Sequence, residues 1–245
     1  MKYAIISDVH SNLEALQIVL EHIRNTGVDK VICLGDIVGY GPNPKECVDL
    51  VKAISNVEVV LGNHDAAIID KTNIHSFNDY AKEAIRINKT LITNTELEYI
   101  SSLKTINVES GLLFVHGSPR DHINEYLTTL NKLQENTEFF NEQICFVGHT
   151  HLPLIYAKLN SGEYYVDNPE NNQEFKLLDD RKYIINTGSV GQPRDHDSRC
   201  CFLYYDTEEK KITYCRLQYN IESVQKKMSD LQLPEFLITR LSYGK

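Results

Sequence analysis

The 245-residue chain has 34 acidic and 25 basic residues, a formal charge of -9 at pH 7. Because no basic run offsets this charge, we expect no non-specific binding to nucleic acid and no binding to an anionic membrane. The longest apolar runs, such as 112–115, are far too short to span a bilayer. Six cysteines without C-x-x-C spacing, and strand-like sequence where a signal peptide would lie, predict a reduced, cytoplasmic protein.

The first 62 residues alternate short apolar runs with amphipathic segments. Strands are expected at 3–6, 31–34 and 57–61. Apolar residues at helical spacing predict helices at 13–23 and 44–54. This strand–helix–strand order is typical of a parallel or mixed sheet with crossover helices.

Residues 66–106 interrupt that order and predict two helices, around 81–91 and 97–103, beside the ends of the strands. Strands follow at 112–115 and 144–147, with a helix expected at about 126–139 between them. The rest of the chain is rich in β-strand sequence, with strands expected at 154–159, 163–166, 183–185, 201–205 and 211–218. One or two short helices are expected within 222–241. Since no linker or repeat is evident, we predict one domain over 1–245 with a helical insertion at about 66–106.

Five of the expected strands end in side chains that can bind metal ions. They carry Asp8 with His10, Asp36, Asn63 with His64, His116, and His149 with His151. Ligands bind beyond the carboxyl ends of strands in open α/β sheets, so these groups can converge. Carboxylate, amide and imidazole donors without a thiolate suit Mn²⁺, Fe, Zn²⁺, Co²⁺ or Ni²⁺. This set of ligands exceeds the needs of one ion, and two ions sharing one carboxylate would use it.

The order of these motifs resembles the calcineurin-like metallophosphoesterase superfamily over residues 3 to about 194. The motifs are Asp8-Val-His10, Gly35-Asp36, Gly62-Asn63-His64-Asp65, His116 and Gly148-His149-Thr150-His151. The chain is most similar to the compact bacterial and archaeal phosphodiesterase branch, near diadenosine tetraphosphatases. This resemblance implies an α/β fold, α+β in some schemes: a four-layer αββα sandwich of mixed sheets with flanking helices.

The resemblance also implies the roles of individual residues. One metal ion would be held by Asp8, His10, Asp36 and His151. The second would be held by the bridging Asp36 with Asn63, His116 and His149. His64 would be the catalytic residue that meets the substrate phosphate or the leaving group. Of the candidate metals, Mn²⁺ is favoured, and the metal pair would activate a water for attack on phosphorus.

Asn12 and Arg194 are the candidate substrate-binding residues. Asn12 either contacts a phosphate or caps the helix that follows it, and Arg194 either pairs with phosphate or forms a surface salt bridge. Gly39 stands where protein Ser/Thr phosphatases of the superfamily have an acid, and their Asp-Arg-Gly arginine is missing. We therefore expect a small phosphodiester or nucleotide substrate rather than a phosphoprotein.

Three alternatives remain open at this point. The first is a metal-free protein-binding scaffold of the same fold, which the complete set of ligands disfavours. The second is a phosphomonoesterase or protein phosphatase. The third is a hydrolase of lipid intermediates, which would need an exposed apolar lid, whereas residues 66–106 carry many polar side chains. The sequence does not specify the oligomeric state.

Overall fold

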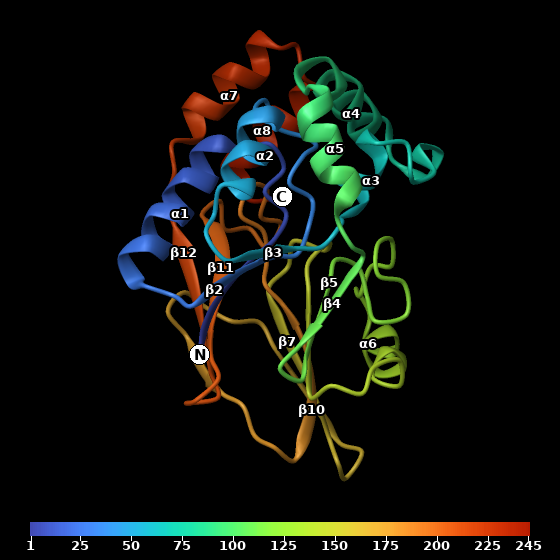
Figure 1. The fold of residues 1–245 in the computed structure, drawn as a ribbon, viewed down its shortest axis with the longest axis vertical. Helices are drawn as coiled ribbons and strands as arrows, with labels where there is room; N and C mark the ends of the chain where they lie inside the picture. The colour runs from blue at the N-terminus through green and yellow to red at the C-terminus, as the bar shows by residue number, and fades with distance from the viewer.

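The computed structural model describes residues 1–245, whose strands form two six-stranded sheets (Figure 1). The first sheet has the order β3 (Val57–Val59), β2 (Lys30–Cys33), β1 (Lys2–Ile6), β11 (Cys200–Asp206), β12 (Lys211–Leu217) and β9 (Glu174–Lys176). The second has the order β4 (Ile106–Glu109), β5 (Leu112–Val115), β6 (Ile144–Val147), β10 (Arg181–Asn186), β7 (Leu154–Leu159) and β8 (Tyr164–Asp167).

Both sheets are mixed, and their parallel strands place the motif-bearing ends together. In the first sheet β1, β2 and β3 are parallel, whereas β11 is antiparallel to β1. In the second sheet β5, β6 and β10 are parallel. The loops after β1, β2, β5 and β6 contain the predicted metal ligands, so parallel pairing collects these ligands within each sheet.

The hydrophobic core lies in layers that follow the alternation of side chains along each strand. Tyr3 and Ile5 of β1 belong to the cluster between the sheets, which includes Phe114 and Phe146 of the second sheet. The intervening residues Ala4 and Ile6 pack on the helical side. In a strand, successive side chains point to opposite faces, so buried strands must be apolar on both faces.

Helices cover the outer faces of the two sheets (Figure 1). Helices α1 (Leu13–Thr26) and α2 (Pro44–Lys52) pack on the first sheet, and α6 (Leu130–Asn136) packs on the second. The protein is therefore a mixed α/β sandwich with flanking helices, and the predicted four-layer αββα arrangement is confirmed. None of the helices combines the length and apolar character that a membrane crossing requires.

The remaining helices gather at one end of the molecule, at the top of Figure 1. They are α3 (Asn63–Ile68), α4 (Asp79–Leu91), α5 (Asn94–Ser102), α7 (Ile221–Asp230) and α8 (Glu235–Arg240), with 3₁₀ turns at Ile74–Ser76 and Leu241–Tyr243. Apolar residues of α4, α7 and α8 form a cluster around Tyr40. The two helices expected in the 66–106 insertion are confirmed as α4 and α5, and the two short C-terminal helices as α7 and α8.

Three sequence-based expectations differ from the structure. The helix expected over 126–139 is wrong at its start, because residues 126–129 form a loop and Thr129 caps α6. The Tyr126 ring instead stacks on the ring of His149. Strands β4 and β9 were not expected, since each is an edge strand of only four or three residues, too short for its alternation to stand out from a loop. Asn63, expected at the end of a strand, begins α3.

Candidate metal centre

The seven predicted metal ligands lie together and are all buried. Each has 4% or less of its surface exposed; they are Asp8, His10, Asp36, Asn63, His116, His149 and His151. They come from the loops after β1, β2, β5 and β6 and from the first turn of α3. Buried charges and imidazoles are costly unless they are paired or bind metal ions, so this cluster needs a chemical reason.

One group of ligand atoms surrounds a point between β1 and the loop after β6. His10 Nε2 lies 3.0 Å from His151 Nε2. The carboxylate Oδ1 of Asp8 lies 3.2 Å from His151 Nε2 and 3.6 Å from His10 Nε2. Asp36 Oδ2 is 3.7 Å from His10 Nε2 and completes the group.

A second group begins at the same oxygen of Asp36. Asp36 Oδ2 lies 3.4 Å from His116 Nε2. That nitrogen is 3.0 Å from Asn63 Oδ1 and 3.1 Å from His149 Nδ1. Two ligands of one ion, bound at about 2.1 Å and at right angles, stand about 3 Å apart. Both groups therefore have the spacing of a coordination shell.

The ring orientation of each of the four histidines is set by a backbone carbonyl. His10 Nδ1 contacts Val38 O at 3.1 Å, and His116 Nδ1 contacts Leu34 O at 2.8 Å. His151 Nδ1 contacts Gln192 O at 2.6 Å, and His149 Nε2 contacts Asn124 O at 3.2 Å. Because a carbonyl only accepts, each of these nitrogens carries the proton, and the other nitrogen presents its lone pair to the cluster.

The lone pairs in the first group face one another, which tests whether its residues fit a metal ion. Two unprotonated imidazole nitrogens at 3.0 Å repel each other and cannot form a hydrogen bond. Asp8 Oδ1 is buried there without a hydrogen-bond partner, while its Oδ2 accepts from His149 N at 3.0 Å. A cation placed between these atoms satisfies all of them. The donor set therefore fits metal ions.

The charges in the cluster also favour a cation. Burial acts against the charged form of Asp8, but the neighbouring histidines outweigh it and keep the pKa of Asp8 well below its usual value. Burial likewise opposes a charge on His116, yet the Asp36 carboxylate raises the pKa of His116 to about 9, so without a metal ion a proton occupies the Nε2 that a cation would bind. Burial lowers the pKa values of His149 and His151 to about 3, so both rings are neutral ligands near pH 7.

The backbone at this site is strained. Asp8, His10, Asp36, His149 and His151 all have positive φ, between 49° and 66°. Each such residue costs about 1–3 kcal/mol unless the surroundings hold it, and such strain clusters at functional sites. Glycine allows the loops to approach closely, since a Cβ at Gly62 would overlap Asp36.

Two buried polar residues support the ligand loops, and the sequence analysis assigned neither a role. Asp65 accepts hydrogen bonds from the backbone N–H groups of Ile37, at 2.9 Å, and Gly62, at 3.2 Å. Burial and the charge of Asp36 raise the pKa of Asp65 to about 7. The sequence indicates that Asp65 supports the ligand loops because it follows Asn63 and His64 directly in one motif.

Asn88 of α4 is the second supporting residue, and it is fully buried. Its Oδ1 accepts from Ser11 Oγ at 2.9 Å and from Gly39 N at 2.8 Å, and its Nδ2 donates to Gly41 O at 2.9 Å. Asn88 thereby joins the loop after His10 to the loop after Asp36. The sequence indicates this role because Asn88 is a polar residue on the apolar face of α4, which also contains Ala81 and Ala84.

His64 lies beside the ligands but has a different environment. Its ring centroid is 4.4 Å from that of Tyr40 and 5.0 Å from that of Phe77. Its Nδ1 is buried without a partner and faces Gly39, where a Cβ would overlap it. No carboxylate therefore holds this nitrogen. A ligand atom of His64 also lies within 4.8 Å of those of His10 and Asp36, which makes a third possible metal-binding group.

The structure places the two predicted substrate-binding residues differently. Asn12 is buried; its Oδ1 accepts from Ala15 N at 3.1 Å and its Nδ2 donates to Gly191 O at 2.9 Å. Of the two alternatives for Asn12, these contacts support the helix cap. Arg194 is half-buried beside the site: its backbone N–H donates to His151 O at 3.3 Å, and its guanidinium lies 5.6 Å from the centre of the Tyr40 ring.

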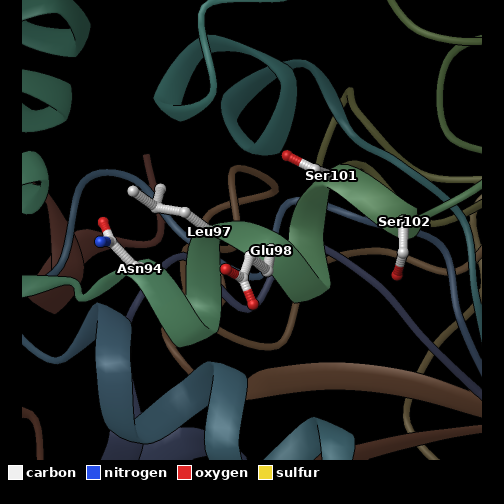
Figure 2. Close-up of a pocket in the computed structure, with 5 residues that line it drawn as sticks. All are labelled: Asn94, Leu97, Glu98, Ser101 and Ser102. Atoms are coloured by element: carbon white, nitrogen blue, oxygen red, sulfur yellow. The ribbon is translucent and has the colours of Figure 1, made fainter.

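A hollow elsewhere on the surface has none of these features. It lies along α5 and is lined by Asn94, Leu97, Glu98, Ser101 and Ser102 (Figure 2). Figure 2 shows Ser101 and Ser102 pointing to opposite sides of the helix. All five residues belong to one helix, and Glu98 is the one ionisable side chain among them. The chemistry therefore lies at the ends of the strands, in the buried cluster of histidine and aspartate.

Comparison with known proteins agrees with this site. The family model for the calcineurin-like phosphoesterase superfamily domain matches residues 1–210. An uncharacterised protein of Methanocaldococcus jannaschii is 39% identical over 253 residues, which cover 99% of this chain and 98% of the relative. The crystal structure of a metallophosphoesterase from Sphaerobacter thermophilus has a TM-score of 0.88 and 38% identity, with 100% of this chain and 99% of that chain covered.

A shorter match is to a protein whose name states its activity. A symmetrical bis(5'-nucleosyl)-tetraphosphatase of Erwinia tasmaniensis is 35% identical over 71 residues, which cover 28% of this chain and 26% of the relative. The family match and the solved relative define a phosphoric ester hydrolase, and the buried cluster contains groups that could hold metal ions. The chain belongs to the calcineurin-like phosphoesterase superfamily.

Proposed function

We propose that this chain is a dinuclear metal-dependent phosphoesterase that hydrolyses phosphodiester or nucleotide-type phosphate bonds. The observation that carries this proposal is the pair of ligand groups that share Asp36 Oδ2. Each group presents lone pairs and carboxylate oxygen to a common point. A single ion would fill only one of the two points.

The proposed ligands of the first ion are Asp8, His10, Asp36 and His151. The proposed ligands of the second are Asp36, Asn63, His116 and His149. Two such ions activate a water molecule and stabilise the charge that develops on the phosphoryl oxygens. Mn²⁺ is the favoured metal, with Fe, Zn²⁺, Co²⁺ or Ni²⁺ as alternatives that the same nitrogen and oxygen donors accept.

The neighbouring residues contribute orientation and charge. The backbone N–H of His64 donates to Asp36 Oδ1 at 2.8 Å, which leaves Oδ2 for the cluster. The His64 side chain is proposed to meet the substrate phosphate or the leaving oxygen. Because no carboxylate faces its Nδ1, we assign it a hydrogen bond to the developing negative charge. Because the Asn63 amide is neutral, it adds no negative charge to the site that a phosphate anion must approach.

Two features favour a small diester or nucleotide over a phosphoprotein. Gly39 supplies no acid to His64, unlike the corresponding position in the protein phosphatases. The bis(5'-nucleosyl)-tetraphosphatase that matches part of the chain is named for a small nucleotide substrate. That match covers about a quarter of each protein, so it supports the substrate class and not one particular compound.

The alternative of a metal-free protein-binding scaffold is disfavoured by the same geometry. A scaffold has no need for the facing lone pairs of His10 and His151, or for the backbone strain at five ligand positions. A phosphomonoesterase is the second alternative, because the metal ligands themselves do not distinguish monoesters from diesters.

The test combines metal analysis with a substrate panel. We expect purified protein, treated with a chelator and reloaded with Mn²⁺, to bind two ions per chain. It should hydrolyse an aryl phosphodiester and dinucleoside polyphosphates with higher kcat/KM than an aryl monoester or a phosphopeptide. Hydrolysis of none of these substrates under any of the five metals, with no bound metal, would support the scaffold instead. A higher kcat/KM for the phosphopeptide would support the protein phosphatase.

A further inference from the structure

Tyr126 is an exposed aromatic residue in direct contact with one of the proposed metal ligands. Its ring stacks on the ring of His149, with the two centroids 3.6 Å apart and the two planes inclined by 29°. His149 presents its Nδ1 to the second ligand group, 3.1 Å from His116 Nε2, so Tyr126 covers a ring whose edge faces that group. Tyr126 is nevertheless 40% exposed. Because His149 covers one face of the ring, its edge and its other face are left to solvent.

The other rings that contact the ligand histidines are closed off from solvent. The ring centroid of Tyr40 is 4.7 Å from that of His10, and Tyr40 is 6% exposed. The ring centroid of His64 is 4.9 Å from that of His10, and His64 is 3% exposed. Tyr126 is therefore the aromatic ring on the solvent side of the ligand cluster. A substrate that comes from solvent to the buried ligands meets this ring.

Contacts on both sides of Tyr126 fix its position in the loop. Before it, Asn124 O accepts from His149 Nε2 at 3.2 Å, and the Glu125 carboxylate accepts hydrogen bonds from three side chains. After it, Leu127 is buried in the cluster on the outer face of the second sheet. A side chain that is already ordered loses little conformational entropy when another group packs on it, so Tyr126 is prepared for binding.

The exposed ring of Tyr126 favours a planar partner. Two aromatic rings attract each other by offset stacking, beyond what burial of the same apolar area provides. Such stacking tolerates different partners, because every aryl group and every base has a flat face. The substituent of a phosphate ester is attached within a few bonds of phosphorus. With the phosphoryl group at the ligand cluster, this substituent is therefore within reach of the ring that covers His149.

We propose that Tyr126 is a platform on which a planar aromatic group of the substrate stacks while the phosphoryl group lies at the metal centre. This inference rests on the proposed phosphoesterase function and makes its substrate class narrower: esters that carry an aryl or base ring are bound in preference to alkyl esters of the same charge. Tyr126 is thereby a specificity-determining residue. Its ring, and not its hydroxyl group, makes the contact.

The first test measures by calorimetry how phosphonates, whose carbon–phosphorus bond is not hydrolysed, bind to the Mn²⁺-loaded protein. Phenylphosphonate and cyclohexylphosphonate are similar in size, but only the phenyl ring is planar. The wild type should bind phenylphosphonate about 3- to 10-fold more tightly than cyclohexylphosphonate. Tyr126→Leu should remove this preference, because leucine keeps an apolar side chain without a flat face. Tyr126→Phe, which loses only the hydroxyl group, should retain the preference.

Tyr164→Leu is the matched control for this experiment. Tyr164 is exposed to a similar extent, 45%, and its ring also stacks on a more buried ring, that of Tyr156. It pairs with Lys158 near the end of β7, whereas the ligand loop joins β7 at its start, at Leu154. The control variant should therefore bind both phosphonates as the wild type does.

The second test separates contact with the substrate from support of the ligand His149. Tyr126→Leu should bind metal about as tightly as the wild type in a titration against a competing chelator, because Asn124 O still accepts from His149 Nε2. Weaker metal binding by this variant, with the preference for phenylphosphonate intact at saturating metal, would assign Tyr126 to the positioning of His149. That result would overturn the platform.

The third test detects the stacked ring directly and needs no variant. In wild-type protein loaded with Zn²⁺, nuclear Overhauser contacts should join the protons of bound phenylphosphonate to the ring protons of Tyr126. The methylenephosphonate analogue of adenosine monophosphate then distinguishes the two kinds of planar group. Contacts from its base protons to Tyr126 would assign the platform to a base. Contacts from phenylphosphonate alone would assign it to an aryl ring close to phosphorus.

The outcomes separate this inference from the proposed function. If the wild type hydrolyses phosphate esters but binds the two phosphonates equally, or if Tyr126→Leu keeps the preference, the platform is wrong and the phosphoesterase stands. Failure of the metal-loaded protein to bind either phosphonate would also overturn the platform. If the wild type cleaves no phosphate ester with any metal, the proposed function itself fails. Should Tyr126→Leu not fold, the contacts to Tyr126 in the wild type decide.

Discussion

Replacement of Asn88 by alanine should destabilise the protein and loosen its metal site, although Asn88 touches no metal ligand atom. The side chain makes three hydrogen bonds, to Ser11 Oγ, Gly39 N and Gly41 O, and none of its surface is exposed. The substitution leaves the backbone N–H of Gly39 and the C=O of Gly41 buried without their partner. Each such group costs about 1–3 kcal/mol.

The expected loss of stability is therefore about 2–5 kcal/mol for Asn88→Ala. This is a large share of the total, since domains are stable by about 5–15 kcal/mol. The matched control is Asn78→Ala, which removes the cap of the same helix, where Asn78 Oδ1 accepts from Ala81 N at 2.9 Å. Loss of a helix cap costs about 1 kcal/mol and does not alter the ligand loops.

Metal affinity provides the readout that distinguishes positioning from stability. Asn88 joins the loops that follow His10 and Asp36, so its loss should weaken metal binding about 10- to 100-fold, the usual effect of residues that orient ligands. Urea unfolding of the metal-free proteins measures stability, and titration against a competing chelator measures affinity. If Asn88→Ala matches Asn78→Ala in both measurements, the loop-joining role of Asn88 is refuted.

Three further predictions concern the ligands and the loop over them. Asp36→Asn should lose metal and activity, because the one carboxylate shared by both groups is removed; two bound ions with full activity, measured by elemental analysis and kinetics, would contradict the dinuclear assignment. His64→Ala should keep both metals while kcat falls about 10²–10⁴-fold; loss of metal with a normal rate per remaining ion would mean that the roles of His64 and Asn63 are reversed. For Glu125, burial is outweighed by contacts with Arg120, Ser118 and Asn136, which lower its pKa to about 2 from an ordinary 4.5. Its stabilisation is therefore complete above about pH 4.5 and is lost as the pH falls toward 2. Urea unfolding should show Glu125→Gln about 1–3 kcal/mol less stable than wild type at pH 7, with the difference shrinking below pH 4.5; an equal difference at pH 7 and pH 3 would contradict this.

The sequence alone determined the layered α/β fold and the set of residues that converge on the site. Asp8 and Asp36 follow strands of the first sheet and His116 and His149 follow strands of the second, and strand periodicity with parallel pairing brings each pair to one edge of its sheet. These signals are short in range, because each motif follows its own strand directly. The packing of the two sheets then brings the two pairs together.

Contacts between distant segments decided what the sequence left open. Asn12 caps a helix because Gly191, 179 residues further along, accepts its other hydrogen bond. Residues 126–129 leave the expected helix because the ring of His149 offers Tyr126 a stacking partner. Tyr40, in the loop after β2, is buried because Leu237 and Ile238 of α8 pack in the same cluster. Helix propensity and apolar spacing describe neighbours along the chain, whereas each of these outcomes depends on a partner that only the tertiary fold supplies.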